Sequence, residues 1–407
     1  ESPDGTTKEG SGSDELKSAR VSQESGGDGF EWDSISYYDT EIVYMDIPLI
    51  STGYNWYDGA LDDYEVVVED PEVCDVELLG KDSYDNMCLG FTAKAEGTTR
   101  VAVCRKDADR NTGECCEAWE IIVNARPSDA ADITDSAMNY ALMEQSYADS
   151  NDDGYVSQEE LAQVDWFSAT NGDIPALRIT DWSALAQMDP YSMQLSHYEF
   201  DDMDFLTDNI QEPIGMQVLR LTDCTVGDYS GLSAFTKLGE LGVNGAGLTD
   251  LSLLQYVNKD NLHTREALDN DITDLTPLEE FDFLHIVRMN GNSGLSDVEV
   301  LKDMDLLTHI NLDGTAVSDA DRWELAAVPE SISLKKNESV YVPSVGEILE
   351  SGECQVTVTE GADRISLTED APNRYYEFQG LRSGKATLEV TYKEYTQTVA
   401  VGVTPFD

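Results

Sequence analysis

An acidic segment, residues 149–160, carries the side chains whose types and spacing most clearly suggest chemistry. A calcium-binding loop needs oxygen ligands at positions 1, 3, 5, 7, 9 and 12, and a glycine at position 6 for a sharp turn. Gly154 stands at the sixth position, and Val156 supplies an aliphatic side chain at the eighth. The ligand positions hold Asp149, Asn151, Asp153, Tyr155 through its carbonyl, Ser157 and Glu160. Because Ca²⁺ prefers many hard oxygen ligands, we predict a structural Ca²⁺ here; a metal-free acidic loop is the alternative.

The loop resembles that of the EF-hand family and its dockerin relatives. A dockerin carries two such loops, and a calcium sensor pairs two hands, whereas this sequence shows one. The resemblance therefore implies a structural ion rather than cohesin docking or a calcium switch. The surrounding residues, 127–168, keep an approximate helical period after Ser128 and Asp129. This pattern predicts a helical, EF-hand-like cap.

Catalytic chemistry finds little support elsewhere in the chain. The H-E-x-x-H, G-x-S-x-G and phosphate-loop patterns do not occur in the sequence. Cys115 and Cys116 have no histidine near them in sequence that would act as a base for a thiol nucleophile. Carboxylates are so numerous that no glycosidase pair stands out. We expect a protein that is not an enzyme.

Composition limits the partners of the protein. Its 407 residues include 25 basic and 81 acidic side chains, which give a formal net charge of −56 at pH 7. Nucleic acid and anionic membranes need a cationic face, so neither is expected as a partner. No apolar run reaches the roughly 18 residues of a membrane span. The length of the chain suggests two to four domains. We also expect the protein to be a monomer.

Residues 169–328 contain a repeat with a period near 22 residues. Successive inward positions, spaced by 22, 24, 22 and 23 residues, are Leu219, Leu241, Arg265, Val287 and Ile310. Each unit is expected to form one short strand, a turn and a helical or 3₁₀ return, and about six to seven units stack into one core. Arg265 is an anomaly at an inward position. Either its guanidinium reaches out to an acidic neighbour, or the register slips there.

An aspartate recurs where each strand is expected to turn into its return. These residues are Asp181, Asp228, Asp250, Asp274, Asp297 and Asp319. Their regular spacing also fits a metal or catalytic role. Turn and helix-cap roles explain them better, because aspartate accepts hydrogen bonds from backbone amides at such corners.

The segments that flank the cap and repeats, 35–126 and 329–407, alternate in the manner of β-strands. Gly90–Val103 and Phe378–Val390 resemble strands of bacterial group 2 immunoglobulin-like domains, and Asp70–Val73 resembles that family's D-P-x-V motif. The resemblance implies two immunoglobulin-like β-sandwiches that act as spacer or adhesion modules.

The repeats resemble leucine-rich repeats of the internalin type, since Asp274–Leu278 is close to that family's D-L-x-P-L motif. The order of cap, repeats and immunoglobulin-like domain is also similar to internalin-like bacterial surface proteins. The expected fold is therefore multidomain α+β: a leucine-rich repeat solenoid with a helical EF-hand-like N-terminal cap, flanked by two immunoglobulin-like β-sandwiches. The resemblance implies a secreted or surface-anchored bacterial protein that grips a protein on a host or neighbouring cell.

Residues 1–34 are rich in Ser, Gly and acidic side chains, which predicts a flexible acidic tether. An extracellular or cell-surface location is expected from the family resemblance. Any attachment is expected at this end, through a lipid anchor whose signal segment is absent from the chain.

The repeat register predicts which side chains project from the concave sheet. The candidates for partner binding are Arg220, Asn244, Leu268, Ile286, Arg288, Asn290 and His309. An ordinary mixed surface is the simpler alternative. A second functional hypothesis is a glycan-binding accessory module of an extracellular polysaccharide-degrading or cell-wall system. In that case Tyr54, Trp56 and Tyr57 are the aromatic side chains expected to stack on sugars.

Seven cysteines are unevenly placed along the chain. Five of them fall within 43 residues: Cys74, Cys88, Cys104, Cys115 and Cys116. Cys104 and either Cys115 or Cys116 flank a turn-like stretch and are candidates for a disulfide in an oxidising compartment; reduced buried thiols are the alternative.

Overall fold

The structure is a computed structural model that describes residues 24–25, 32, 39–55, 60–81, 86–107, 117–171, 174–210 and 215–405. The chain forms two compact units. The first comprises residues 1–140, 152–155 and 172–180, and the second comprises 141–151, 156–171 and 181–407. Most of the predicted tether, together with Trp56, Tyr57, Cys115 and Cys116, lies outside the described residues.

Two sheets make up the β-rich part of the first unit, as far as it is described. One has the order β1-β4-β7-β8-β2, with β1 at Glu24–Ser25, β2 at Asp39–Tyr44, β4 at Tyr64–Val68, β7 at Gly97–Arg105 and β8 at Glu117–Asn124. The other has the order β3-β6-β5, with β3 at Leu49–Asn55, β5 at Cys74–Lys81 and β6 at Asn86–Ala93. A 3₁₀ turn, η2 (Leu61–Asp63), precedes β4. All five side chains of β4 are buried, so this strand lies in the core of the unit.

Cys104 in β7 is disulfide-bonded. Its predicted partners, Cys115 and Cys116, fall outside the described residues. Four other cysteines are buried thiols outside any disulfide: Cys74, Cys88, Cys224 and Cys354. Burial raises the pKa of Cys74 to about 12 and that of Cys354 to about 11, so these thiols stay protonated at neutral pH.

The predicted cap contains less helix than its sequence period suggests. Within the described residues its helical parts are α1 (Ser136–Tyr140), a π-helical turn η3 (Ala141–Gln145), and α2 (Gln158–Leu161). Residues 166–170, which the sequence assigned partly to the cap, form the first strand of the repeat sheet instead. Phe167 and Ala169 are buried in alternation there. A five-residue strand with alternating burial gives only a weak signal beside a helical pattern.

The repeats form a parallel sheet of seven described strands in the order β17-β16-β15-β14-β12-β10-β9. The strands are β9 (Trp166–Thr170), β10 (Ser192–Ser196), β12 (Val218–Thr222), β14 (Glu240–Asn244), β15 (Thr264–Glu266), β16 (Ile286–Arg288) and β17 (His309–Asn311). The register pairs Leu219 with Leu241, Leu241 with Arg265, and Arg265 with Val287. This confirms the predicted leucine-rich repeat architecture and its inward column.

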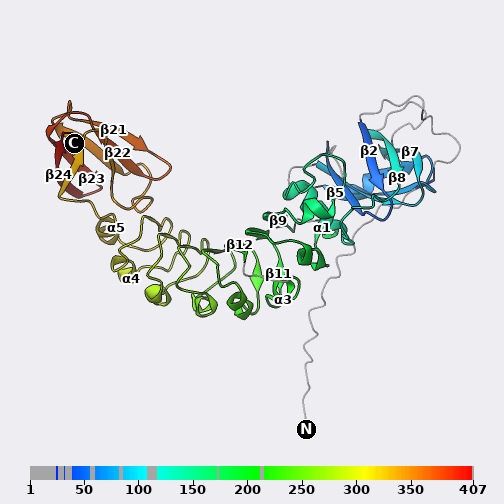
Figure 1. Cartoon of the computed structure of the whole chain (residues 1–407), viewed down its shortest axis with the longest axis horizontal. Coiled ribbons are helices and arrows are strands. Elements are labelled where there is room, and N and C mark those ends of the chain that lie inside the picture. The colour runs from blue at the N-terminus through cyan, green and yellow to red at the C-terminus, as the bar shows by residue number, and fades with distance from the viewer. Residues whose placement is uncertain are drawn as a thin grey trace, which may run out of the picture. The chain divides into compact units, whose positions relative to one another are not determined.

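Short helices return the chain from each strand to the next, and Figure 1 shows them along the outer side of the curved solenoid, with the strands along the inner side. They are η5 (Ser183–Gln187), α3 (Asp204–Thr207), η7 (Ser230–Ala234), η8 (Ser252–Tyr256), η9 (Thr276–Glu280), α4 (Glu299–Lys302) and α5 (Asp319–Leu325). A further 3₁₀ turn, η4 (Pro175–Leu177), belongs to the first unit. A two-stranded pair, β11 (Glu199–Phe200) and β13 (Thr225–Val226), lies between two turns of the solenoid.

Five of the six repeated aspartates form corners of the solenoid, as predicted. The carboxylate of Asp250 accepts a hydrogen bond from the amide of Ser252, and that of Asp274 accepts one from Thr276, both at 2.8 Å. The same hydrogen bond, from the amide two residues later in the chain, is accepted by Asp181, Asp228 and Asp297. Asp319 differs, because Ser318 caps α5 in its place. Asp319 pairs with Lys393 at 2.7 Å.

Asparagine side chains join successive turns inside the solenoid. Asn270 Oδ1 accepts from the amides of Ala246 and Leu248, and its Nδ2 donates to the carbonyl of Val243. Asn292 is placed equivalently in the next turn, where its Oδ1 accepts from Ile272. These bonds satisfy backbone groups that would otherwise be buried without partners.

Both ends of the repeat sheet are closed. At the N-terminal edge, Gln145 Oε1 accepts from the amide of Thr170 at 2.8 Å, and Ser146 Oγ accepts from the amide of Ser168 at 3.1 Å. At the other edge, Gly346 takes the place of a further strand: its carbonyl accepts from Ile310 at 3.0 Å. Covered edges cannot pair with another chain, which protects the solenoid against edge-to-edge association.

The C-terminal domain also consists of two sheets among the described residues. One has the order β18-β24-β23-β20, with β18 at Ser331–Lys335, β20 at Cys354–Glu360, β23 at Gly384–Tyr392 and β24 at Tyr395–Thr404. The other has the order β19-β22-β21, with β19 at Ser339–Val342, β21 at Ile365–Asp370 and β22 at Tyr375–Gly380. Phe378, Leu388 and Val399 are fully buried in its core. No helix in the described part of the chain is long and apolar enough to span a membrane.

Candidate binding face of the solenoid

The outward side chains of the seven strands form columns on the concave side of the sheet. The strand register places one residue of each strand in a central column: Ser168, Gln194, Arg220, Gly242, Glu266, Arg288 and Asn311. Every position of this column carries a polar or charged side chain except Gly242. This column therefore decides the electrostatics of the face.

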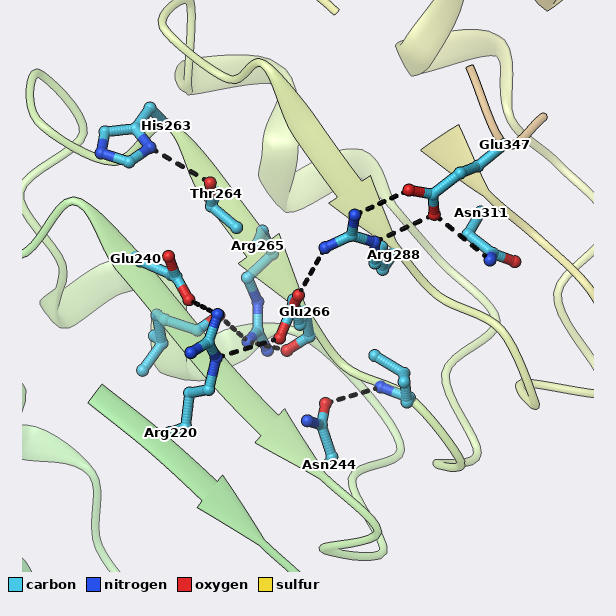
Figure 2. Close-up of polar contacts among 12 residues, drawn as sticks. Arg220, Glu240, Asn244, His263, Thr264, Arg265, Glu266, Arg288, Asn311 and Glu347 are labelled. Atoms are coloured by element: carbon cyan, nitrogen blue, oxygen red, sulfur yellow. Dashed lines mark hydrogen bonds and ion pairs between the residues drawn. The ribbon is translucent and has the colours of Figure 1, made fainter. Parts of the chain in front are cut away.

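Charged side chains on this face form one continuous network, which we call the concave ion chain: Glu240, Arg220, Glu266, Arg288 and Glu347 (Figure 2). Arg220 pairs with Glu240, and its Nε lies 3.4 Å from Glu266 Oε2. Arg288 Nη1 donates to Glu266 Oε1 at 2.8 Å. Arg288 also donates to both carboxylate oxygens of Glu347, at 3.0 and 2.7 Å. Such two-pronged pairs fix the geometry of both partners.

Gly242 makes the network possible. It lies between Arg220 and Glu266 in the central column. A Cβ atom at Gly242 would lie 3.2 Å from Arg220 Cγ and 3.4 Å from Glu266 Oε2. The missing side chain therefore leaves the space in which Arg220 crosses one strand to reach Glu266.

The contacts within the ion chain shift the pKa values of Glu347 and Arg288. Burial acts to raise the pKa of Glu347, but the hydrogen bonds and charge of Arg288 outweigh it, and the pKa is lowered. The hydrogen bonds that Arg288 donates to Glu347 raise the pKa of Arg288 above its already high value. Both groups are therefore charged at neutral pH. The arginine side chains keep 34% and 29% of their surface exposed, for Arg220 and Arg288 respectively.

Glu347 belongs to the segment that connects β19 to β20, so the ion chain links the solenoid to the C-terminal domain. Asn311 Nδ2 donates to Glu347 Oε2 at 3.4 Å. Arg374 donates to the carbonyl of Glu347 at 3.1 Å and pairs with Asp313 at 2.6 Å. Arg288, which the sequence suggested as a partner-binding residue, thus also holds two domains together.

The side chains of the other predicted concave residues make no hydrogen bond or ion pair with this network in the described part of the chain. Ile286 and His309 are neighbours in the first column and are half-buried. Asn244 Oδ1 accepts a hydrogen bond from the amide of Leu268 at 3.0 Å, so both residues contribute to the turn after the strand. Asn290 is half-buried, and its carbonyl accepts from Asp269. The structure brings Arg220 and Arg288 together through Glu266, but it does not gather all seven residues into one patch.

Arg265 occupies the inward column and is fully buried (Figure 2). Its Nη1 donates to the carbonyls of Leu241 at 3.1 Å and Glu266 at 2.6 Å. Nε and Nη2 have no hydrogen-bond partner in the described part of the protein. Burial lowers the pKa of Arg265 to about 10. Both sequence-based explanations are therefore wrong: the register does not slip, and the guanidinium stays inside, where two strand carbonyls accept its hydrogen bonds.

The predicted calcium loop is divided between the two units, with Asp153 and Tyr155 in the first and the other four ligand candidates in the second. Gly154 has φ +89°, the conformation that the sharp turn of such a loop requires. Within the first unit, Tyr155 donates its phenolic proton to Asp129 at 3.0 Å.

Glu160, the last predicted ligand, is engaged at the start of α2. One of its carboxylate oxygens accepts from Ser150 and the other from Ser157, each through a backbone amide and a hydroxyl, at 2.8 to 3.0 Å. Burial opposes the charged form, but these bonds lower the pKa of Glu160. No group of three or more His, Cys, Asp or Glu side chains is arranged to hold a metal among the residues described. Calcium binding stays a prediction.

The sequence matches none of the protein families with which it was compared, and none of the curated proteins. Several solved structures are similar to it. Internalin C2 from Listeria monocytogenes is 19% identical, with 49% of this chain and 84% of that chain covered and a TM-score of 0.33. A secreted internalin-like protein from the same organism is 13% identical, with 70% and 100% covered and a TM-score of 0.31. At these scores the likeness does not decide the fold, which the strand register and repeated turns establish by themselves.

Proposed function

We propose that this is a non-catalytic bacterial protein, secreted or held at the cell surface, that binds a protein partner through the concave face of its solenoid. The concave ion chain carries the proposal. Its arginines are held in fixed positions by buried carboxylates, yet each keeps about a third of its surface exposed. Charged groups that are already ordered lose little entropy on binding, and they favour partners whose charges are complementary.

The remaining parts of the chain have supporting roles in this proposal. The cap binds a structural Ca²⁺ in the loop at 149–160, because the loop has the ligand spacing and a glycine with the required φ. The two pairs of sheets are immunoglobulin-like spacer modules, and a lipid at the N-terminal side of the chain attaches the protein to the cell. The protein acts as a monomer, since a net charge of −56 disfavours association with a second copy.

The test begins with capture of host and bacterial surface proteins by the full chain and continues with titration of the purified partner. Arg220→Ser removes one of the two partly exposed arginines of the ion chain. Arg382→Ser, in the C-terminal domain, removes another exposed arginine and serves as the matched control. We expect Arg220→Ser to weaken binding at least tenfold and Arg382→Ser to leave it unchanged. Equal affinities of the two variants would contradict the concave-face proposal.

A second candidate function, glycan binding, is favoured by two exposed aromatic side chains at the N-terminal end of the repeat sheet. Trp166 lies in β9 and pairs with Ser192 of β10. Tyr191 directly precedes Ser192, and the side chains of both Trp166 and Tyr191 are exposed. Aromatic rings stack on the apolar faces of sugars. Glycan-array binding that is lost in Trp166→Ala and Tyr191→Ala, but kept in Tyr341→Ala, would support this function. Binding that does not depend on Trp166 or Tyr191 would reject it.

A further inference from the structure

Two large apolar side chains are exposed side by side on the last turns of the solenoid. Phe283 is 50% exposed and Leu306 is 42% exposed. Ile286 and His309 are paired with each other in neighbouring strands. Phe283 lies three residues before Ile286, and Leu306 lies three residues before His309. The two positions are therefore equivalent in consecutive turns, and parallel strands lie about 4.8 Å apart. We call Phe283 and Leu306 the leading-edge pair.

The solenoid core does not need apolar side chains at these positions. The neighbouring residues, Leu284 and Leu307, are the ones buried in the core. Three earlier turns have small or polar residues at the position of the leading-edge pair: Gly215, Lys237 and Asn261. A fold requirement would apply to every turn, so it does not explain why the last two turns differ.

Exposed carboxylates flank the leading-edge pair in sequence. Exposed Asp282 and Asp305 directly precede Phe283 and Leu306, and Asp303 is exposed on the same turn as Leu306. In the described part of the chain, none of these three aspartates pairs with a cation. The nearby Lys302 is already engaged with Glu299, Asp321 and Glu324, at 2.6 to 3.1 Å. The surface is therefore apolar with an uncompensated anionic rim.

The leading-edge pair also continues onto the concave face. His285 is exposed in the turn after Phe283, and Ile286 and His309 follow as half-buried members of the first concave column. On its other side, His309 lies against Tyr375 of the C-terminal domain, with the ring centroids 6.3 Å apart.

We propose that the leading-edge pair is a contact site for a protein partner that presents apolar side chains flanked by Lys or Arg. The apolar groups would cover Phe283 and Leu306, and the cations would face the flanking aspartates. A second copy of this chain does not fit, because it would bring like charges to the same rim and carries a net charge of −56. The inference rests on the proposed function and names the chemistry of the partner.

The test measures binding of a labelled synthetic peptide of alternating Leu/Phe and Lys/Arg residues to the full chain. One matched peptide replaces the apolar residues with Ser, and another replaces the basic residues with Glu. We expect binding of the first peptide only, with a dissociation constant raised at least tenfold by Phe283→Ser together with Leu306→Ser. Tyr341→Ser with Leu381→Ser, at comparably exposed positions of the C-terminal domain, is the control and is expected to bind as the wild type.

Two results would overturn the inference. Equal binding of the Ser-substituted peptide would mean that cations alone are attracted to an acidic chain, and unchanged binding by the Phe283/Leu306 variant would place the contact elsewhere. Unchanged thermal unfolding of each variant shows that the fold is intact. Arg220→Ser distinguishes this inference from the proposed function: it is expected to weaken binding of the captured partner while leaving peptide binding unchanged.

Discussion

The guanidinium of Arg288 donates two hydrogen bonds to the carboxylate of Glu347, at 3.0 and 2.7 Å, across 59 residues of sequence. One residue lies in the sixth strand of the repeat sheet, and the other lies in the segment that enters the C-terminal domain. Gly346 extends the same sheet through its hydrogen bond with Ile310. The solenoid and the C-terminal domain are therefore joined by backbone pairing and by a partly buried ion pair.

Removing one member of this pair is expected to destabilise the protein. Arg288→Ala leaves the buried Glu347 carboxylate without its main donors, which costs about 1–3 kcal/mol. The free energy of unfolding in urea measures the effect. Arg382→Ala, whose contact with Asp363 at 3.4 Å is exposed, is the control and is expected to change stability little. Equal stability of the two variants would show that the pair does not hold the domains together.

Stability is also expected to fall in acid through Glu347. Its pKa is lower in the folded protein than in the unfolded chain, where glutamate titrates near pH 4.3. Its contribution is therefore present above the unfolded pKa and is lost as the pH falls through the folded pKa. The difference in unfolding free energy between wild type and Glu347→Gln should shrink below about pH 4. A difference that stays constant from pH 6 to pH 2 would contradict this assignment.

The buried charge of Arg265 is expected to lower the stability of the folded protein. Two of its nitrogen atoms lack hydrogen-bond partners in the described part of the chain, and its side chain is fully buried. Replacing buried ionic groups by apolar ones of similar volume is often neutral or stabilising. We therefore expect Arg265→Met to raise the unfolding free energy by about 1 kcal/mol, whereas Arg265→Ala should lower it by leaving a cavity. Strong destabilisation by Arg265→Met would mean that the bonds to the two carbonyls outweigh the burial of charge.

Calcium is expected to stabilise the protein through the loop at 149–160. An extracellular-type site has a dissociation constant of about 10⁻⁴ to 10⁻³ M or tighter, and a hundredfold excess over that constant adds about 2.7 kcal/mol. Thermal unfolding with Ca²⁺ and with a chelator measures the gain. Glu160→Gln should reduce it, while Glu159→Gln, one residue away and exposed, should not. An equal response of the two variants would argue against Glu160 as a ligand.

The repeat sheet was the most predictable part of the fold, because the apolar positions recur at a nearly constant interval. Leu219, Leu241, Val287 and Ile310 therefore fall into one inward column, as the sequence indicates. The corner aspartates were equally predictable, since their hydrogen bond reaches only two residues ahead. Local chemistry of this kind can be deduced from spacing alone.

The concave ion chain could not be predicted in the same way. The register showed that Arg220 and Arg288 project from one face, but Glu347 comes from a loop outside the repeats. The role of Gly242 depends on where the side chain of Arg220 runs, which no spacing rule specifies. The cap was predicted with too much helix, since its described helical parts are only α1, the π-helical turn η3 and α2.

Displacing Arg220 without removing any charge tests the binding account most directly. Gly242→Val is compatible with a strand but places atoms where Arg220 crosses to Glu266. Gly402→Val is the control, because a Cβ atom there would have its nearest neighbours at 4.0 Å. We predict that titration of the purified partner will show at least a tenfold loss of affinity for Gly242→Val and none for Gly402→Val, with both variants folded. Wild-type affinity of Gly242→Val would contradict the claim that the concave ion chain is the binding face.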